Sequence, residues 1–146
     1  MNTSSHSHAM AAAVAAITVS IAPAMAQTAG KATLVPVSQV TWANAGVPSV
    51  HTAVVRGDMK TGPSHFYLKY AAGFATPPHH HSPDHFVTTV SGNLVLVADG
   101  KEQAMPPGSY FALTGKARHS ARCEGAQDCV MFIDARGPWD VVVDKH

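Results

Sequence analysis

The sequence has no excess of charge of either sign and no stripe of basic residues. Its 146 residues include 10 Lys and Arg and 9 Asp and Glu, which gives a formal net charge of +1 with histidine neutral. All of these charged residues lie after residue 26, where the two signs are interspersed. Proteins that bind nucleic acid rely on clustered Lys and Arg, so the sequence does not indicate a nucleic-acid partner.

Hydrophobic runs long enough to span a bilayer are also missing. The almost unbroken apolar stretch over residues 9–21 has 13 residues, which is too short for a spanning helix. It is followed by Ala24-Met25-Ala26, with small residues at both positions that a signal peptidase recognises. We therefore predict a cleaved signal peptide over residues 1–26 and a single mature domain over 27–146, periplasmic or secreted and without a stable membrane anchor. Because Lys and Arg are absent before the apolar stretch, a retained N-terminal helix is the alternative.

Common catalytic motifs are absent as well. The sequence contains no G-x-S-x-G nucleophile motif, no glycine-rich phosphate-binding loop and no H-E-x-x-H zinc motif. It therefore does not indicate a serine hydrolase, a P-loop nucleotide-binding enzyme or a protease of the H-E-x-x-H type.

No helical hydrophobic period occurs after residue 26, and short strand-like runs separated by Gly and Pro fill the mature chain. The clearest run is 65–70, where Phe66, Leu68 and Tyr70 alternate with more polar residues. Many short strands with such turns predict an all-β sandwich or barrel. Before them, an irregular segment over 32–49 is expected to bury Leu34, Val35, Val37, Val40 and Trp42. The expected strands are 52–56, 65–70, 86–91, 94–98, 102–105, 109–113, 120–123, 130–135 and 141–143.

Four of the ten histidines lie within seven residues, at 79–81 and 85. On an extended strand His79 and His81 share one face and His80 points the other way. The turn-forming residues 82–84 can bring His85 back toward the first pair. Converging imidazoles without cysteine or carboxylate favour zinc, copper, nickel or iron over magnesium or calcium. The alternative is an exposed histidine-rich loop that binds metal adventitiously.

Two cysteines, Cys123 and Cys129, bracket a polar loop between two strand-like runs. They are placed to face each other across a hairpin, and a disulfide closing so short a loop would contribute about 2 kcal/mol. Such a bond fits an oxidising compartment. Two reduced thiols are the alternative.

One small basic cluster, formed by Lys116, Arg118 and Arg122, surrounds His119. Its charges suit either a solvated strand edge or an anchor for a substrate anion.

The spacing of the histidine-rich stretch resembles the first motif of the cupin superfamily, G(X)5HXH(X)3,4E(X)6G. Gly73, His79, His81 and Gly92 occupy its conserved positions, and His85 stands where the motif usually has glutamate. This exchange replaces one metal ligand by another.

The second cupin motif, G(X)5PXG(X)2H(X)3N, is similar to residues 108–123 but degraded. Gly108 and His119 match, whereas its proline, X-Gly pair and asparagine are replaced. The resemblance covers roughly residues 33–144. The tail Gly137-Pro138-Trp139-Asp140 is similar to the ending of small cupins related to the metal-binding cupin half of certain anti-sigma factors. The residues that replace the motif's proline, X-Gly pair and asparagine are Thr114, Gly115-Lys116 and Cys123.

The resemblance implies a double-stranded β-helix, or jelly-roll barrel, whose mouth holds one divalent transition metal: Fe, Zn, Ni, Cu or Mn. It also implies a small-molecule substrate or ligand, and it is compatible with a homodimer. The implied metal ligands are His79, His81, His85 and His119.

Two functions are compatible with that site. With a six-coordinate metal, two positions stay free for substrate and dioxygen or water, which favours an oxygenase such as a non-heme dioxygenase acting on a small anionic or enolisable substrate. Four neutral imidazoles leave the metal charge uncompensated, which favours anion binding. With a tetrahedral zinc that takes all four, the site is closed, which favours a non-catalytic binding or sensing module.

Overall fold

The computed structural model describes residues 30–145. The predicted signal peptide over 1–26 and its cleavage site therefore lie outside the described residues. The chain divides into two units, Met1–Thr33 and Leu34–His146, and residues 30–33 of the first are exposed without regular structure. Within the described range, no helix combines the length and hydrophobicity needed to cross a membrane.

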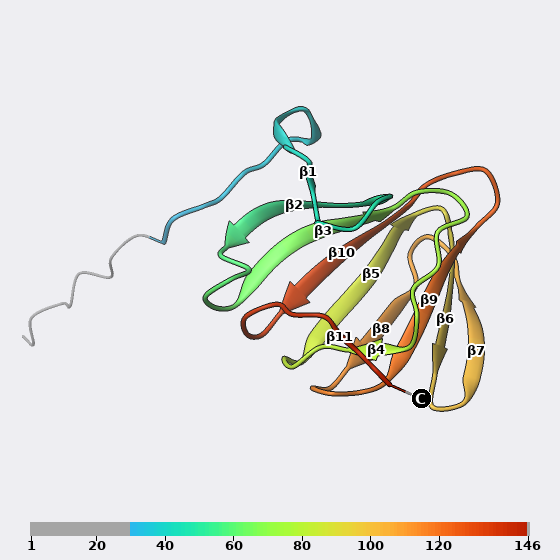
Figure 1. The fold of residues 1–146 in the computed structure, drawn as a ribbon. Helices are drawn as coiled ribbons and strands as arrows, with labels where there is room; N and C mark the ends of the chain where they lie inside the picture. Colours follow the sequence, from blue (N-terminus) through green and yellow to red (C-terminus); the bar gives the residue numbers. More distant parts are fainter. Residues whose placement is uncertain (1–29, 146) are drawn as a thin grey trace, which may run out of the picture. The chain divides into compact units, whose positions relative to one another are not determined.

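The second unit is built from short β-strands in two antiparallel sheets (Figure 1). One sheet has the strand order β1-β2-β3-β10-β5-β8 and the other β11-β4-β9-β6-β7. A three-residue 3-10 helix, η1 (Val37–Gln39), precedes the strands. The strands are β1 (Ala43–Asn44), β2 (Val50–Gly57), β3 (Ser64–Tyr70), β4 (His79–His80), β5 (His85–Ser91), β6 (Asn93–Ala98), β7 (Lys101–Met105), β8 (Tyr110–Leu113), β9 (His119–Glu124), β10 (Cys129–Ala135) and β11 (Val142–Val143).

From β3 onward the chain repeatedly crosses from one sheet to the other. β3, β5, β8 and β10 lie in the first sheet, whereas β4, β6, β7, β9 and β11 lie in the second. Two antiparallel sheets wound in this way form a jelly roll, so the predicted all-β fold is confirmed. The sequence signals were clearest in β3, β5, β9 and β10, where buried residues alternate with more exposed ones, and turns that contain Gly or Pro follow most of the strands.

The core lies between the two sheets. On β3 every second residue is buried, with Phe66 fully buried and Leu68 and Tyr70 at 8% and 7% exposure. β10 has the same alternation, and its Met131 and Ile133 pair with Leu68 and Phe66. Leu68, Tyr70, Met131 and Ile133 also line the pocket beside the histidines described below.

The segment before β2 departs from the sequence prediction. Leu34, Val35 and Val37 were expected to be buried, but they are 84%, 39% and 90% exposed. Trp42 packs instead on the outward-facing Tyr67, with ring centroids 6.3 Å apart. The prediction was wrong because β2 and β3 already close this side of the core, which leaves the preceding segment on the outer face.

A disulfide joins Cys123 at the end of β9 to Cys129 at the start of β10. Both residues are buried, at 2% and 0% exposure. Gly92 lies directly against this bond, because a Cβ there would be 2.8 Å from the Cys129 Sγ, and its φ of +80° also favours glycine. The disulfide thus closes the end of the strand that begins at His119.

Candidate metal centre

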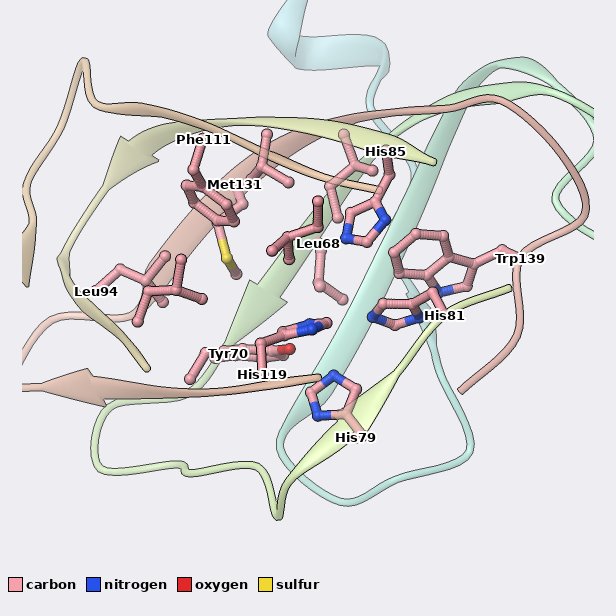
Figure 2. A pocket seen from close by; sticks show the side chains of 15 residues that line it. Leu68, Tyr70, His79, His81, His85, Leu94, Phe111, His119, Met131 and Trp139 are labelled. Atoms are coloured by element: carbon pink, nitrogen blue, oxygen red, sulfur yellow. The ribbon is translucent and has the colours of Figure 1, made fainter. Parts of the chain in front are cut away.

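Four histidines from three parts of the chain converge at one end of the jelly roll (Figure 2). His79 lies on β4, His81 directly follows it, and His85 and His119 begin β5 and β9. Strand pairing sets His79 opposite His119. All four side chains are buried, with exposures between 3% and 7%.

Three of the four form a compact donor group. One ring nitrogen from each of His79, His81 and His119 lies within 4.8 Å of the others, which is a geometry able to hold a metal ion. His85 lies beside this group, with its ring centroid 4.8 Å from that of His81 and 5.9 Å from that of His119. The structure therefore brings all four predicted ligands to one site, with three close together and the fourth adjacent.

Backbone carbonyls fix the orientation of these rings. The Nδ1 atoms of His79 and His119 lie 2.9 Å from the carbonyl oxygens two residues earlier, and His85 has the same contact at 3.3 Å. His81 Nδ1 bonds to the carbonyl oxygen of Asp140. A carbonyl only accepts, so each Nδ1 must carry the proton, which leaves each Nε2 with a lone pair available to a metal.

Burial keeps the four imidazoles neutral. Loss of solvation lowers the pKa of His81 from 6.5 to about 3 and that of His119 to about 4. Burial also lowers the pKa of His79 and of His85. A metal ligand must be deprotonated, so the site is prepared for a cation at neutral pH.

The segment after β10 completes the site, a role that the strand pattern did not predict. The Trp139 ring stacks on His81, with centroids 3.9 Å apart and planes at 24°, and meets the His85 ring edge-on at 5.1 Å. The next residue, Asp140, binds Ser82 through both carboxylate oxygens. The sequence signal for this segment was the Gly137-Pro138-Trp139-Asp140 tail. The structure adds that its Trp139 and Asp140 contact His81 and Ser82.

A small inner pocket lies next to the histidines and is lined by all four of them. Its volume is about 30 Å³, and the rest of its wall is mainly aliphatic and aromatic. The two other side chains in the wall that carry hydrogen-bonding groups are Tyr70 and Trp139. Burial raises the pKa of Tyr70, so its phenol stays protonated. Sequence reasoning grouped Tyr70 with Phe66 and Leu68 in the strand alternation and missed its position at this pocket.

The three basic residues predicted around His119 lie in different surroundings. Arg122 is on the outer face of β9, bound by Glu102 and Glu124 at 2.7 to 2.8 Å. Arg118 Nε lies 3.0 Å from Asp144 Oδ2, and the Arg118 side chain is 63% exposed. Lys116, Arg118 and Arg122 are all absent from the wall of the inner pocket.

The remaining histidines of the cluster region stand apart. His80 points away from the site and its Nδ1 lies 2.9 Å from Asp144 Oδ1. His65 lies 3.4 Å from Asp134. Asp84 accepts a hydrogen bond from the Gly115 amide at 2.6 Å, so it ties two loops together beside His85.

Solved structures with the same fold share little sequence with this chain. KdgF from a Halomonas species has 17% identity and a TM-score of 0.62, covering 73% of this chain and 94% of its own. The polyketide cyclase RemF from Streptomyces resistomycificus has 18% identity and a TM-score of 0.65, covering 80% and 87%. An RmlC-like cupin from Shewanella frigidimarina has 16% identity and a TM-score of 0.60, covering 74% and 92%.

A search of curated proteins gave no match. The cupin domain family, however, matches residues 66–135, which run from β3 to the end of β10 and include the four histidines. This match identifies residues 66–135 as a cupin domain, and the shared jelly roll agrees with it.

Proposed function

We propose that this protein is a metal-dependent enzyme of the oxygenase type, a non-heme dioxygenase acting on a small anionic or enolisable substrate. The observation that carries the proposal is the common orientation of four buried histidines, each with Nδ1 held by a carbonyl and Nε2 free. So many matched hydrogen bonds are unnecessary for a histidine-rich surface loop, but they are what a metal site needs.

The donor set fits one divalent transition metal: Fe, Zn, Ni, Cu or Mn. His79, His81 and His119 would hold it, and His85 would add the fourth imidazole. A bound metal would supply Lewis acidity, redox chemistry where its identity allows, and a net positive charge of about two units that neutral imidazoles leave uncompensated. That charge favours a deprotonated oxygen on the substrate.

The protein's own residues would position the reactants. The Tyr70 hydroxyl and the Trp139 indole are placed at the inner pocket, where each can donate a hydrogen bond to a substrate oxygen. The surrounding aliphatic wall excludes bulk water, which strengthens such bonds. A pocket of about 30 Å³ has room for dioxygen or about two water molecules beside the histidines.

A second function, a non-catalytic metal- or ligand-binding module, is favoured by one observation. The His85 ring lies 4.8 Å from that of His81, so a fourth imidazole is available beside the three-histidine group, and a zinc site with four protein ligands would be closed. Such a closed site would stabilise the jelly roll or report metal availability. The two functions differ in whether the metal keeps an exchangeable position.

Location is part of the proposal. Export fits the predicted signal peptide, and the Cys123–Cys129 bond fits an oxidising compartment. Protein should therefore be purified from the periplasm or medium before its metal is measured by elemental analysis.

The deciding experiment compares small-anion binding with oxygen consumption. We expect azide to change the spectrum of the iron-, copper- or cobalt-loaded protein, and a panel of enolisable compounds to produce metal-dependent oxygen uptake with the native metal. A metal that ignores azide and shows no oxygen uptake across the panel would reject the enzyme in favour of the binding module.

A further inference from the structure

We propose that the organic substrate binds mainly outside the barrel core, in a cleft between the β1–β2 region and the segment after β10, and that its body is uncharged and apolar. This inference rests on the proposed function and specifies its substrate class. The substrate would present one oxygen-bearing head to the metal past His79 and His81 while its carbon skeleton fills the cleft.

The inner pocket and the cleft differ greatly in volume. The inner pocket measures about 30 Å³, which is too little for any organic molecule of several carbon atoms. The cleft measures about 610 Å³. Pockets that hold small-molecule ligands measure roughly 300 to 1,000 Å³. The cleft therefore has the size of a substrate site, and the inner pocket has that of a site for dioxygen or water.

The two spaces adjoin at the candidate metal centre and share part of their walls. Leu68, Tyr70, His79, His81 and Trp139 line both the inner pocket and the cleft. Figure 2 shows His79, His81 and Trp139 side by side at the edge of the inner pocket. A molecule in the cleft would therefore touch the same two histidines that a metal would bind.

Much of the cleft wall is apolar, which favours a ligand with an apolar body. Val47, Val50, Phe74, Val141 and Val143 contribute aliphatic or aromatic groups from three separate segments. Their side chains would bury a hydrocarbon skeleton, which is favourable at about 25 cal/mol per Å².

Few charges oppose such a ligand. The charged residues in the cleft wall are Lys60 and Asp140. The Asp140 carboxylate is already bound by the Ser82 amide and hydroxyl, at 2.7 and 2.5 Å. Lys60 is exposed, so its ammonium keeps its water. A polyanionic substrate would find little compensation along this wall.

The basic residues Arg118 and Arg122 near His119 lie outside the cleft. Arg118 lines an open hollow of about 450 Å³ that also contains Asp99. Arg118 is itself paired with Asp144. Neither it nor Arg122 lines the cleft. The negative charge of the substrate is therefore confined to the head that meets the metal.

Two pairs of valines provide matched tests. Val143 lines the cleft, whereas its neighbour Val142 on β11 does not, and the two are 56% and 40% exposed. Val47 lines the cleft and Val54 does not, at 47% and 48% exposure. Tryptophan at Val143 or Val47 would fill the cleft, and Val47 lies outside the β4–β11 ladder in which Val143 pairs with the candidate ligand His79. The same change at Val142 or Val54 controls for added surface hydrophobicity.

The probes are 2-naphthol, a neutral aromatic with one oxygen, and malonate, a small dianion. We expect the zinc-loaded protein to bind 2-naphthol, with NMR shifts in β2 and β11, and V143W and V47W to weaken this binding about tenfold or more. V142W and V54W should bind as the parent does. Malonate should shift resonances at the histidines alone.

Four outcomes would show that the cleft is not the substrate site, three from binding and association and one from turnover. The first is equal binding of 2-naphthol by V143W and V142W. The second is malonate shifting cleft residues while 2-naphthol does not. The third is a dimer, seen by analytical ultracentrifugation, that V143W and V47W dissociate, because the cleft would then be an interface between two copies. An inactive metal with intact 2-naphthol binding would refute the enzyme and leave the cleft as a ligand site, whereas turnover unaffected by V143W and V47W would refute the cleft alone.

Discussion

The indole ring of Trp139 stacks on the imidazole ring of His81, with the two centroids 3.9 Å apart and the planes at 24°. The residue that follows it, Asp140, accepts the hydrogen bond from His81 Nδ1 through its carbonyl oxygen. Trp139 also packs edge-on against Phe66 of the core, at 5.1 Å. One short segment near the C-terminus thus connects the hydrophobic core to the orientation of a candidate ligand.

The first prediction concerns this contact. Trp139→Ala should lower zinc affinity about tenfold by freeing the His81 ring, an effect typical of residues that orient a ligand. It should also reduce the free energy of unfolding by about 2 to 3 kcal/mol because a large side chain is lost from the core edge. Competition with a chelating dye and urea unfolding measure the two effects. Trp139→Phe keeps an aromatic ring and should preserve most of the affinity; equal losses in both variants would contradict the stacking role.

The second prediction separates ligands from their neighbour. Alanine at His79, His81 or His119 should abolish tight metal binding, and alanine at His85 should weaken it. His80→Ala should retain the metal, because that side chain points to Asp144. Metal content by elemental analysis and thermal unfolding with and without zinc test this. Retention by His119→Ala together with loss in His80→Ala would show that the assigned ligand set is wrong.

These positions show how far sequence reasoning reached. The alternation on β3 predicted which of its residues share a face, and the spacing of His79 and His81 predicted that these two do, because strand geometry has a period of two. The contacts of His81 with Trp139 and Asp140 join residues about 60 positions apart. No local pattern encodes such a pairing, since it depends on how the two sheets close.

The local sequence pattern also failed to predict which side chains are exposed to solvent in two places. Leu34 and Val37 are as apolar as core residues but lie before the first sheet strand, where no partner covers them. Arg122 and His119 lie three residues apart on β9, so their side chains point to opposite faces of the strand and only the histidine faces inward. Their closeness in the sequence suggested that the two residues act at one site, but the alternation of β9 places them on opposite faces.

The third prediction is a loss of stability of the metal-free protein in mild acid. His81 and His119 have folded-state pKa values of about 3 and about 4, against 6.5 for exposed histidine. Below pH 6.5 the unfolded chain therefore binds more protons, and stability falls as the pH decreases toward 4. Each such histidine contributes about 1.4 kcal/mol per pH unit in this window.

Urea unfolding of the chelator-treated protein at pH 7 and pH 5 measures this effect. His81→Gln should reduce the difference between the two pH values, because glutamine does not titrate. An unchanged difference would argue against neutral buried imidazoles.

The fourth prediction concerns export and the disulfide. Exported protein should begin near Gln27, and it should contain no alkylatable thiol until reductant is added, because Cys123 and Cys129 are joined. N-terminal sequencing and intact mass before and after reduction test the two parts separately. Replacing both cysteines by serine should lower the free energy of unfolding by about 2 kcal/mol or more. An unprocessed N-terminus on exported material would reject the signal peptide.

The fifth prediction distinguishes the metal from the basic residues as the source of anion binding. If the uncompensated metal charge attracts anions, loss of a ligand such as His119 should abolish azide binding. Arg118→Ala should weaken it by no more than about twofold, because the Arg118 side chain is 63% exposed and already paired with Asp144. Azide titrations of the cobalt-substituted protein at low and high salt give both affinities. The salt dependence should be small, since a charge buried among four histidines is poorly screened. A large loss in Arg118→Ala, with metal content intact, would instead make the arginine an anion anchor and place the approach of charged ligands on the His119 side of the site.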